Sequence, residues 1–342
     1  MLAGGVGGAR FVRGLREAVR WWHPDAAIDV VVNTGDDWWL GGLRITPDLD
    51  SLLYTLAGQN DEQRGWGRVG ESERVAAELQ AYGVTPEWFT LGDLDLGTHI
   101  ARTAWLRSGA SLSEVVARLQ ERWDLGGVRL HPATDDEVDT HVWVASDAGG
   151  ERDLHFQEWW TRYRAQLPAL RFEQRGLAAA RPSAGALAAL EAADVVIIAP
   201  SNPVVSIGTI VSIPGMRDAL RAVTAPIVGV SPIIAGAAVR GMADACLAAI
   251  GVATDAGAVA RLYGPRSGVA LAPAAAPFSA AAPLPGLLDA WLVDEADAGV
   301  VDGLRADGIA TDAVPLWMRD LDSAAALAEA ALQAGLARRS AS

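Results

Sequence analysis

Two short segments rich in glycine and aspartate hold the residues of this chain with the clearest chemistry. The first is residues 4–10, GGVGGAR, and the second is residues 33–37, NTGDD. Glycines allow backbone N–H groups to approach a phosphate closely. The paired Asp36 and Asp37 would repel that phosphate unless a cation lay between them. Together the two segments predict a nucleotide-diphosphate substrate that is held through a divalent metal ion.

The aspartate pair has candidate partners a few residues further on. Asp48 and Asp50 follow in the segment PDLD, and in an extended stretch their side chains would point the same way. Carboxylates grouped in this manner are typical of a hard-cation site with oxygen ligands, and Mg²⁺ fits best because it also binds phosphate oxygens and keeps waters. The histidines show no zinc spacing. A capping or solvated-turn role is the alternative for Asp36 and Asp37.

Several further residues are weaker candidates for a site. Arg10 stands where a dinucleotide fingerprint would place its third glycine, and there it can meet a phosphate. Thr98 can cap a helix, and His99 is a candidate for a substrate contact or proton relay. Aromatic residues in 155–160 are typical of a core, although a planar heteroaromatic ligand could stack on them. The Ser-Asn-Pro segment 201–203 offers a hydroxyl and an amide, or forms a simple turn.

Composition excludes several classes of protein. The 342 residues carry a formal net charge of −14, which argues against nucleic acid and anionic membranes as partners. All 28 basic residues are arginine, so a Walker A lysine and a Schiff-base lysine are both excluded. Cys246 is the single cysteine, so no internal disulfide can form, and its apolar surroundings indicate a buried structural thiol. No segment has the pattern of a membrane span or signal peptide, and we expect a cytoplasmic protein.

The segments around the two loops predict a parallel sheet. Residues 1–3 and 28–32 are expected to form strands on either side of a helix at about 9–22, which is the opening of a doubly wound fold. Further strands are expected at 194–199, 226–230, 290–293 and 309–315. Four unusual loops follow the first strands directly, and in a parallel sheet they would share the carboxyl edge, where ligands bind. We therefore predict an α/β fold with a mostly parallel, doubly wound sheet.

The middle of the chain has a different pattern. Helices are expected at 71–82, 98–108 and 111–123, the last capped by Ser111, and a β-hairpin at 138–146 and 151–156. We predict a nucleotide-binding core from residues 1–50 plus 182–342, and a largely helical insertion from residues 51–181. Residues 270–285 are rich in alanine and proline, and we expect a mobile loop there.

These stretches together resemble the 2-phospho-L-lactate transferase family of coenzyme F420 biosynthesis, and most closely its bacterial branch, which is described as phosphoenolpyruvate transferase. The matching segments, in order, are residues 2–11, 31–37, 47–54, 64–67, 82–88, 91–103, 133–141, 155–166, 199–208 and 224–251. The resemblance implies a Rossmann-like core with a helical insertion on the deazaflavin side, usually in a homodimer.

The resemblance also implies a reaction between small molecules. A GDP-linked donor carries enolpyruvyl or lactyl phosphate, the acceptor is the terminal ribityl hydroxyl of the deazaflavin Fo, and GMP leaves. The implied catalytic residues are Asp36, Asp37 and Arg10, and the implied Mg²⁺ ligands are Asp36, Asp48 and Asp50. The implied donor-nucleotide residues are Gly5, Gly7, Gly8, Ser201, Asn202 and Ser231. The implied deazaflavin residues are Asp93, Thr98, His99 and Trp159.

The chain departs from this family in places, and other functions stay open. Family members begin with several more apolar residues before Leu2, and we interpret the difference as a misassigned start. Arg240 stands where some relatives carry lysine, which changes the geometry of the charge. One alternative is a UDP-sugar-binding regulatory protein of the same superfamily. Another is a metal-dependent glycosyltransferase, suggested by Asp-x-Asp pairs. A nicotinamide enzyme fits less well because the glycine fingerprint is broken.

Overall fold

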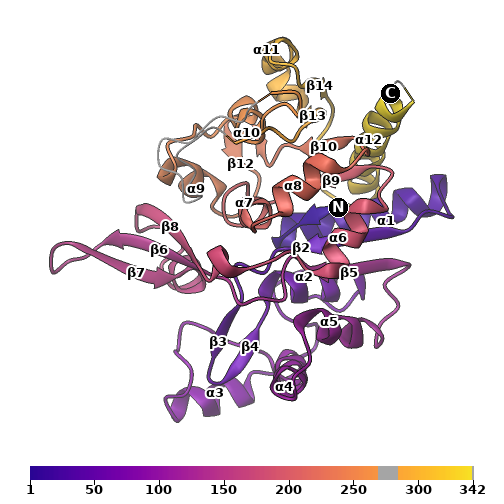
Figure 1. Ribbon diagram of the computed structural model, residues 1–342. Helices are drawn as coiled ribbons and strands as arrows, with labels where there is room; N and C mark the ends of the chain where they lie inside the picture. The colour runs from indigo at the N-terminus through magenta and orange to yellow at the C-terminus, as the bar shows by residue number, and fades with distance from the viewer. Residues whose placement is uncertain (269–283, 341–342) are drawn as a thin grey trace.

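The computed structural model describes residues 1–268 and 284–340, and its centre is a seven-stranded sheet (Figure 1). The strand order is β14-β13-β10-β9-β1-β2-β5, and every neighbouring pair is parallel. The strands are β1 (Leu2–Ala3), β2 (Ile28–Val32), β5 (Val128–Pro132), β9 (Val196–Ile198), β10 (Ile227–Val230), β13 (Ala290–Val293) and β14 (Ala310–Ala313). The chain winds outward in both directions from β1, so the order reverses between β1 and β9. This switch point is where doubly wound sheets bind ligands.

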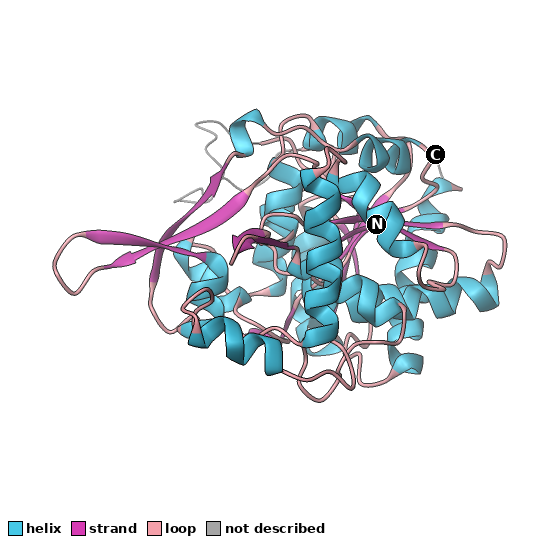
Figure 2. Cartoon of the chain, turned by 90° about the horizontal axis from the view of Figure 1, so that it is seen from below, coloured by secondary structure: helices cyan, strands magenta, loops and turns pink. Residues whose placement is uncertain are grey.

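Successive side chains of each strand point to opposite faces of the sheet, so each face carries its own hydrophobic layer. Val30 and Val32 join the layer that contains Phe11 and Leu15, whereas Val31 joins Leu2 in the opposite layer. Helices on both sides cover these layers (Figure 2). They include α1 (Gly5–Trp22), α2 (Pro47–Leu56), α5 (Leu112–Gln120), α6 (Ala184–Glu191), α7 (Ile207–Ser212), α8 (Met216–Ala222), α9 (Ala243–Ala249), α10 (Ala256–Tyr263), α11 (Val301–Ala306) and α12 (Leu321–Arg339).

The chain between β2 and β9 builds two smaller structures beside the core. The hairpin of β3 (Trp38–Leu40) and β4 (Leu43–Ile45) lies with α3 (Arg74–Ala81) and α4 (Asp93–Arg107). The second is an antiparallel sheet of β6 (Asp139–Ala145), β7 (Glu151–His155) and β8 (Ala169–Arg175), which extends from the body in Figure 1. Short elements complete the fold: a π-helix (Glu158–Arg162), 3₁₀ turns (Leu177–Ala179, Glu295–Val300), and strands β11 (Ile233–Ile234) and β12 (Ala237–Ala238).

The predicted α/β class and parallel sheet are confirmed, as are the six predicted core strands and the hairpin of β6 and β7. The capping box of Ser111 and Glu114 is also present. Within the described part of the chain, six strands are additional to the predicted ones: β3, β4, β5, β8, β11 and β12. β8 pairs with β6, and β5 joins the core sheet although it lies within the predicted insertion. The division into core and insertion stays a prediction, with β5 on the core side. The alanine/proline-rich stretch lies outside the described residues, apart from Leu284 and Pro285.

Three predicted local structures are wrong. The first helix begins at Gly5, not near residue 9, so its glycines lie inside a helix despite their low helix propensity. Asp48 and Asp50 lie in the first turn of α2, not in an extended stretch. Proline at the first helical position followed by acidic residues favours a helix start. Thr98 lies within α4 and does not cap it, because that helix begins at Asp93.

Within residues 1–268 and 284–340, the helices are all too short or too polar to cross a lipid bilayer.

Candidate active site

The glycine turn after β1 packs against two neighbouring segments at the carboxyl edge of the sheet. A Cβ atom on Gly4 would lie 2.5 Å from Asp48 Oδ2, and one on Gly8 would lie 2.7 Å from Ser201 Oγ. Ser201 Oγ accepts a hydrogen bond from the Gly4 N–H at 3.1 Å and donates one to the Gly4 carbonyl at 2.7 Å. Gly5 has a φ of +64°, which favours glycine. The glycines therefore allow the start of α1 to approach Asp48 and Ser201.

Asp36 and Asp48 meet at this edge through Asn33. The Asn33 Nδ2 amide donates to Asp36 Oδ1 at 3.1 Å and to Asp48 Oδ2 at 2.9 Å, and all three side chains are buried. The Asn33 Oδ1 atom accepts from the Gly35 N–H at 3.0 Å, which fixes the orientation of the amide. Asn33 was absent from the predicted site, although it is the first residue after β2. One amide thus holds two carboxylates that are far apart in the sequence.

Burial and mutual repulsion govern the charge of this pair. Burial, followed by the charge of Asp48, raises the pKa of Asp36 well above its usual range. Burial raises the pKa of Asp48 to about 6, against the hydrogen bonds from Asn33 and the Gly5 backbone. Two buried carboxylates cannot both ionise easily unless a cation compensates them. This all-oxygen donor set beside a glycine turn fits Mg²⁺.

Asp37 is the least satisfied polar side chain at the site. It is fully buried, and neither carboxylate oxygen has a hydrogen-bond partner among the described residues. The Arg44 Nη2 atom lies 3.9 Å from Asp37 Oδ2. Burial raises the pKa of Asp37 well above its usual range, against the charges of Arg44 and Arg102. Because an unpartnered buried carboxyl group is costly, Asp37 indicates a position that a ligand, ion or water completes.

Asp50 points away from Asp48 into a second cluster, because residues two apart on a helix are about 200° apart. Asp50 forms an ion pair with Arg102, and its Oδ2 atom lies 3.7 Å from His99 Nδ1. The Asp95 Oδ1 atom lies 3.3 Å from His99 Nε2 and accepts a 2.7 Å hydrogen bond from the Tyr54 hydroxyl. The predicted metal ligands Asp48 and Asp50 therefore belong to different clusters.

This second cluster is closed by arginine. One ligand atom from each of Asp50, Asp95 and His99 lies within 4.8 Å of the others, a spacing that could hold a metal ion. However, Arg102 binds Asp50, and its Nη1 atom donates to His99 Nδ1 at 2.8 Å. Because a guanidinium can only donate, His99 carries its proton on Nε2, toward Asp95. The arginine supplies the positive charge that a metal would bring, and we interpret the cluster as structural.

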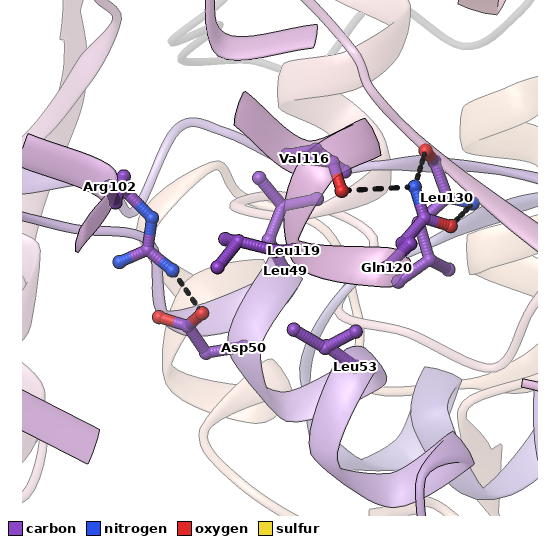
Figure 3. A pocket seen from close by; sticks show the side chains of 8 residues that line it. All are labelled: Leu49, Asp50, Leu53, Arg102, Val116, Leu119, Gln120 and Leu130. Carbon is purple, nitrogen blue, oxygen red and sulfur yellow. Dashed lines mark hydrogen bonds and ion pairs between the residues drawn. The ribbon is translucent and has the colours of Figure 1, made fainter. Parts of the chain in front are cut away.

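The Asp50–Arg102 pair also borders a small pocket (Figure 3). The lining is mainly apolar and consists of Leu49, Asp50, Leu53, Arg102, Val116, Leu119, Gln120 and Leu130. Gln120 is held by the Val116 and Leu130 backbones, as the dashed lines in Figure 3 show. The Arg102 Nε atom is buried without a hydrogen-bond partner among the described residues, but one guanidinium nitrogen does not define a binding site, and we assign no ligand to the pocket.

The predicted nucleotide-side residues lie in adjacent loops. β10, β9, β1 and β2 are contiguous, so the four predicted loops share one edge of the sheet. Asn202 Oδ1 accepts from the N–H groups of Val204 and Val205, and Ser231 Oγ accepts from and donates to the Ile233 backbone. These side chains hold their own turns, so a ligand would meet mainly the backbone there.

Three of the four predicted deazaflavin residues, Asp93, Thr98 and His99, lie on α4, whereas Trp159 lies in the π-helix Glu158–Arg162. Asp93 binds Ser72, and Thr98 is partly exposed on α4. Trp159 is fully buried, packs edge-on against Phe172, and donates to the Leu167 carbonyl at 2.8 Å. Trp159 therefore has no free face on which a ligand could stack. We correct its predicted role from deazaflavin contact to core packing.

An aromatic cluster that the sequence reading missed lies directly after Asp37. Trp38 stacks on His155 with ring centroids 4.8 Å apart and on Trp88 at 5.9 Å, and Phe89 meets it edge-on at 5.1 Å. Trp38 Nε1 and His155 Nε2 are buried without a hydrogen-bond partner among the described residues. Burial, followed by the charge of His141, lowers the pKa of His155 to about 3. The two tryptophans at positions 38 and 39, directly after the aspartate pair, were the sequence feature that could have predicted this aromatic cluster.

Comparisons with known proteins agree with this geometry. The chain matches the 2-phospho-L-lactate transferase CofD family over residues 1–311. Proteins named phosphoenolpyruvate transferase from Thermobifida fusca and Streptomyces griseus are each 50% identical to it, over 98% and 97% of this chain and 97% and 96% of theirs. A solved UPF0052-family structure from Bacillus halodurans shares the fold, with a TM-score of 0.56 at 16% identity over 97% of both chains.

The fold and the family together define an α/β enzyme of the transferase class. The chain belongs to the 2-phospho-L-lactate transferase CofD family, which confirms the resemblance drawn from its motifs.

Proposed function

We propose that this enzyme transfers a phosphoenolpyruvyl or 2-phospholactyl group from a GDP-linked donor to the terminal ribityl hydroxyl of deazaflavin Fo, with release of GMP. Family membership and the names of the 50% identical relatives support the transferred group. The observation that carries the proposal is the pair Asp36 and Asp48, which shares the amide of Asn33 beside the glycine turn. Such a carboxylate pair next to the backbone of a glycine turn suits a metal-bridged diphosphate.

Asp36 and Asp48 would hold Mg²⁺, which supplies positive charge to the diphosphate when it is bound. Asn33 orients both carboxylates toward that ion. The glycine turn at the start of α1 presents backbone N–H groups, and Arg10 follows in the next turn. These residues stabilise the charge that develops on the leaving GMP.

Asp37 would receive the proton of the attacking hydroxyl. The ribityl oxygen forms a bond to the phosphorus of the three-carbon phosphate group, and the bond from that phosphorus to the GMP oxygen breaks. Burial raises the pKa of Asp37, which makes its carboxylate a stronger base, although a loose transition state asks little of a proton acceptor. Asp36 is less suited because it shares Asn33 with Asp48.

The deazaflavin would bind near Trp38 and His155. Each ring carries a buried nitrogen atom that has no hydrogen-bond partner among the described residues. Trp38 follows Asp37 directly in the sequence, and His155, which stacks on Trp38, interacts with the Asp37 backbone. We favour this cluster over Trp159. Asp93 and Thr98 stay as predicted contacts, whereas His99 is buried in the cluster that Arg102 closes.

The test combines turnover with ligand-induced stabilisation. Mass spectrometry of reactions with Fo and a GDP-linked donor should detect the transferred product for the wild type, and Asp36→Asn should abolish it while the protein remains folded. Asp25→Asn, an exposed turn residue, is the matched control and should stay active. GDP plus Fo should raise the unfolding temperature. Stabilisation only by a UDP-sugar would instead favour the regulatory alternative.

A further inference from the structure

Arg10 and Arg240 form no ion pair among the described residues of an acid-rich chain, although the charge of Arg10 contributes to lowering the pKa of Glu62. The sequence has 42 acidic and 28 basic residues, so counter-ions are abundant. Arg13, one turn after Arg10 on α1, donates to Glu62 at 2.7 Å. Neither Arg10 nor Arg240 forms a hydrogen bond or an ion pair within the described residues. Both side chains are exposed, so their positive charges are available to an external anion.

Three segments bring the two arginines to one region. Arg10 lies in the second turn of α1, and Arg240 lies between β12 and α9. Loop 61–67 contacts both segments. Its Glu62 pairs with Arg13, and a Cβ atom on its Gly65 would lie 2.8 Å from Arg240 Nη2. Gly65 has a φ of +79°, which favours glycine there. The Arg240 guanidinium thus rests on the backbone of this loop.

The region adjoins the proposed donor site. α1 starts at the end of β1, and the segment that carries Arg240 starts at the end of β10, so both leave the carboxyl edge of the sheet. Met242, two residues after Arg240, contacts the Asn202 amide at 3.7 Å. Burial lowers the pKa of Arg240, and the charge of Arg10 lowers it further, which agrees with their proximity. Two like charges held together favour binding of an anion that relieves their repulsion.

We propose that Arg10 and Arg240 together bind one oxyanion of the substrate at the entrance of the site. The inference rests on the proposed function and adds Arg240 and its Gly65 support to it. Paired guanidinium groups bind phosphate or carboxylate oxygens through several charge-assisted hydrogen bonds. The anion is either a phosphate of the nucleotide diphosphate or the acidic end of the three-carbon group.

Calorimetric titration with three probes in the presence of Mg²⁺ tests the proposal. The probes are inorganic pyrophosphate, GDP and phosphoenolpyruvate. Arg10→Gln and Arg240→Gln should each weaken binding of at least one probe about tenfold, and Arg240→Lys should recover part of the affinity because it keeps the charge but not the planar guanidinium. Arg20→Gln removes an exposed arginine at the far end of the same helix and should bind like the wild type. Unchanged unfolding temperatures would show that the variants are folded.

The pattern across probes identifies the anion. Weaker binding of GDP and pyrophosphate assigns the arginines to the diphosphate, and weaker binding of phosphoenolpyruvate alone assigns them to the three-carbon group. Wild-type affinity of both glutamine variants for all three probes, or no binding of any probe by the wild type, would overturn the proposal. Loss of anion binding without any product from Fo would leave the arginine site standing and remove the proposed function. Product formation by the wild type, together with unaltered anion binding in both glutamine variants, would support the proposed function and remove the arginine site.

Discussion

At the scale of single residues, Asn33 decides how the acidic site is built. Its one amide nitrogen donates to both Asp36 and Asp48, so it holds two carboxylates together that would otherwise repel each other. No cation from the chain takes this place among the described residues, in contrast to Asp50, which has Arg102. Protonation of one carboxyl group therefore lowers the electrostatic cost of the pair, and a bound cation would do the same.

Asp48 gives a testable pH dependence. Its pKa is about 6 in the folded protein and about 3.9 in an unfolded chain. Between these values the folded state keeps a proton that the unfolded state has released, so stability falls as pH rises toward 6. Without metal, Asp48→Asn should remove a decline of about 1.4 kcal/mol between pH 5 and 7.5. Urea unfolding with EDTA at both pH values measures it, with Asp25→Asn as the control. An unaltered slope would contradict the prediction.

His155 should act in the opposite direction. Its pKa is about 3 when folded and about 6.5 when unfolded, so the unfolded state binds the proton first and stability is lost as pH falls below 6.5. His155→Phe keeps a ring against Trp38 and should remove about 2 kcal/mol of the loss between pH 7.5 and 5. Urea midpoints of the variant and wild type at the two pH values test this. Equal acid sensitivity of the two proteins would show that the imidazole does not titrate in this way.

At the scale of elements, Arg102 joins α2, α4 and the β3–β4 hairpin. From α4 it binds Asp50 of α2, and its Nη1 atom donates to the Arg44 carbonyl of β4 at 3.1 Å. The Arg44 N–H donates to Thr103 Oγ1 at 2.9 Å, so α4 holds both backbone groups of Arg44. This places the Arg44 guanidinium between Asp37 and Asp139. The cluster around Arg102 thus fixes the position of Arg44, which in turn faces Asp37 of the candidate site.

Removing Arg102 should therefore be severe. Arg102→Met leaves Asp50 buried without a counter-ion and should lower the free energy of unfolding by about 3–5 kcal/mol. Adding Asp50→Leu removes the uncompensated charge and should restore part of that loss. Arg107→Met, near the exposed end of α4, should change stability by less than about 1 kcal/mol. Denaturant unfolding compares the four proteins, and a double variant less stable than Arg102→Met would refute the ion-pair interpretation.

At the scale of the whole molecule, the first and last helices close one layer over the sheet. α1 and α12 pack together, and Figure 1 shows α12 beside the start of the chain. Gly14 makes their close approach feasible, because a Cβ atom there would lie 2.5 Å from the Ala324 backbone carbonyl. The packing of residues more than 300 positions apart thus depends on one missing side chain.

Two glycine-to-alanine changes should therefore have opposite signs. Gly14→Ala must push α12 away and should destabilise the protein by about 1–3 kcal/mol, despite the better helix propensity of alanine. Gly97→Ala in α4 meets nothing within 4 Å and should stabilise it by up to about 1 kcal/mol. Thermal and urea unfolding of both variants test this. Stabilisation by Gly14→Ala would mean that the two helices separate at little cost.

Local patterns determined much of this protein in advance. Interactions between residues close in sequence explain several features: the apolar strands 196–198 and 227–230, the Ser111 cap and the loops at the strand ends. The rules involved are side-chain alternation, helix capping and turn chemistry. These rules need no knowledge of distant residues. They were sufficient to predict the α/β sheet and to place the acidic and glycine segments at one edge.

Tertiary structure alone decided which side chains meet. Asn33 joins Asp36 to Asp48, Arg102 takes Asp50 away from them, and Trp159 is enclosed in the core. Strand β5 joins the sheet across many residues of intervening chain. The partner and burial of a side chain depend on contacts between segments far apart in sequence, and these contacts set whether a carboxylate is paired, protonated or free to bind a metal. The residue types were therefore readable from the sequence, but the division between site and scaffold followed from the fold.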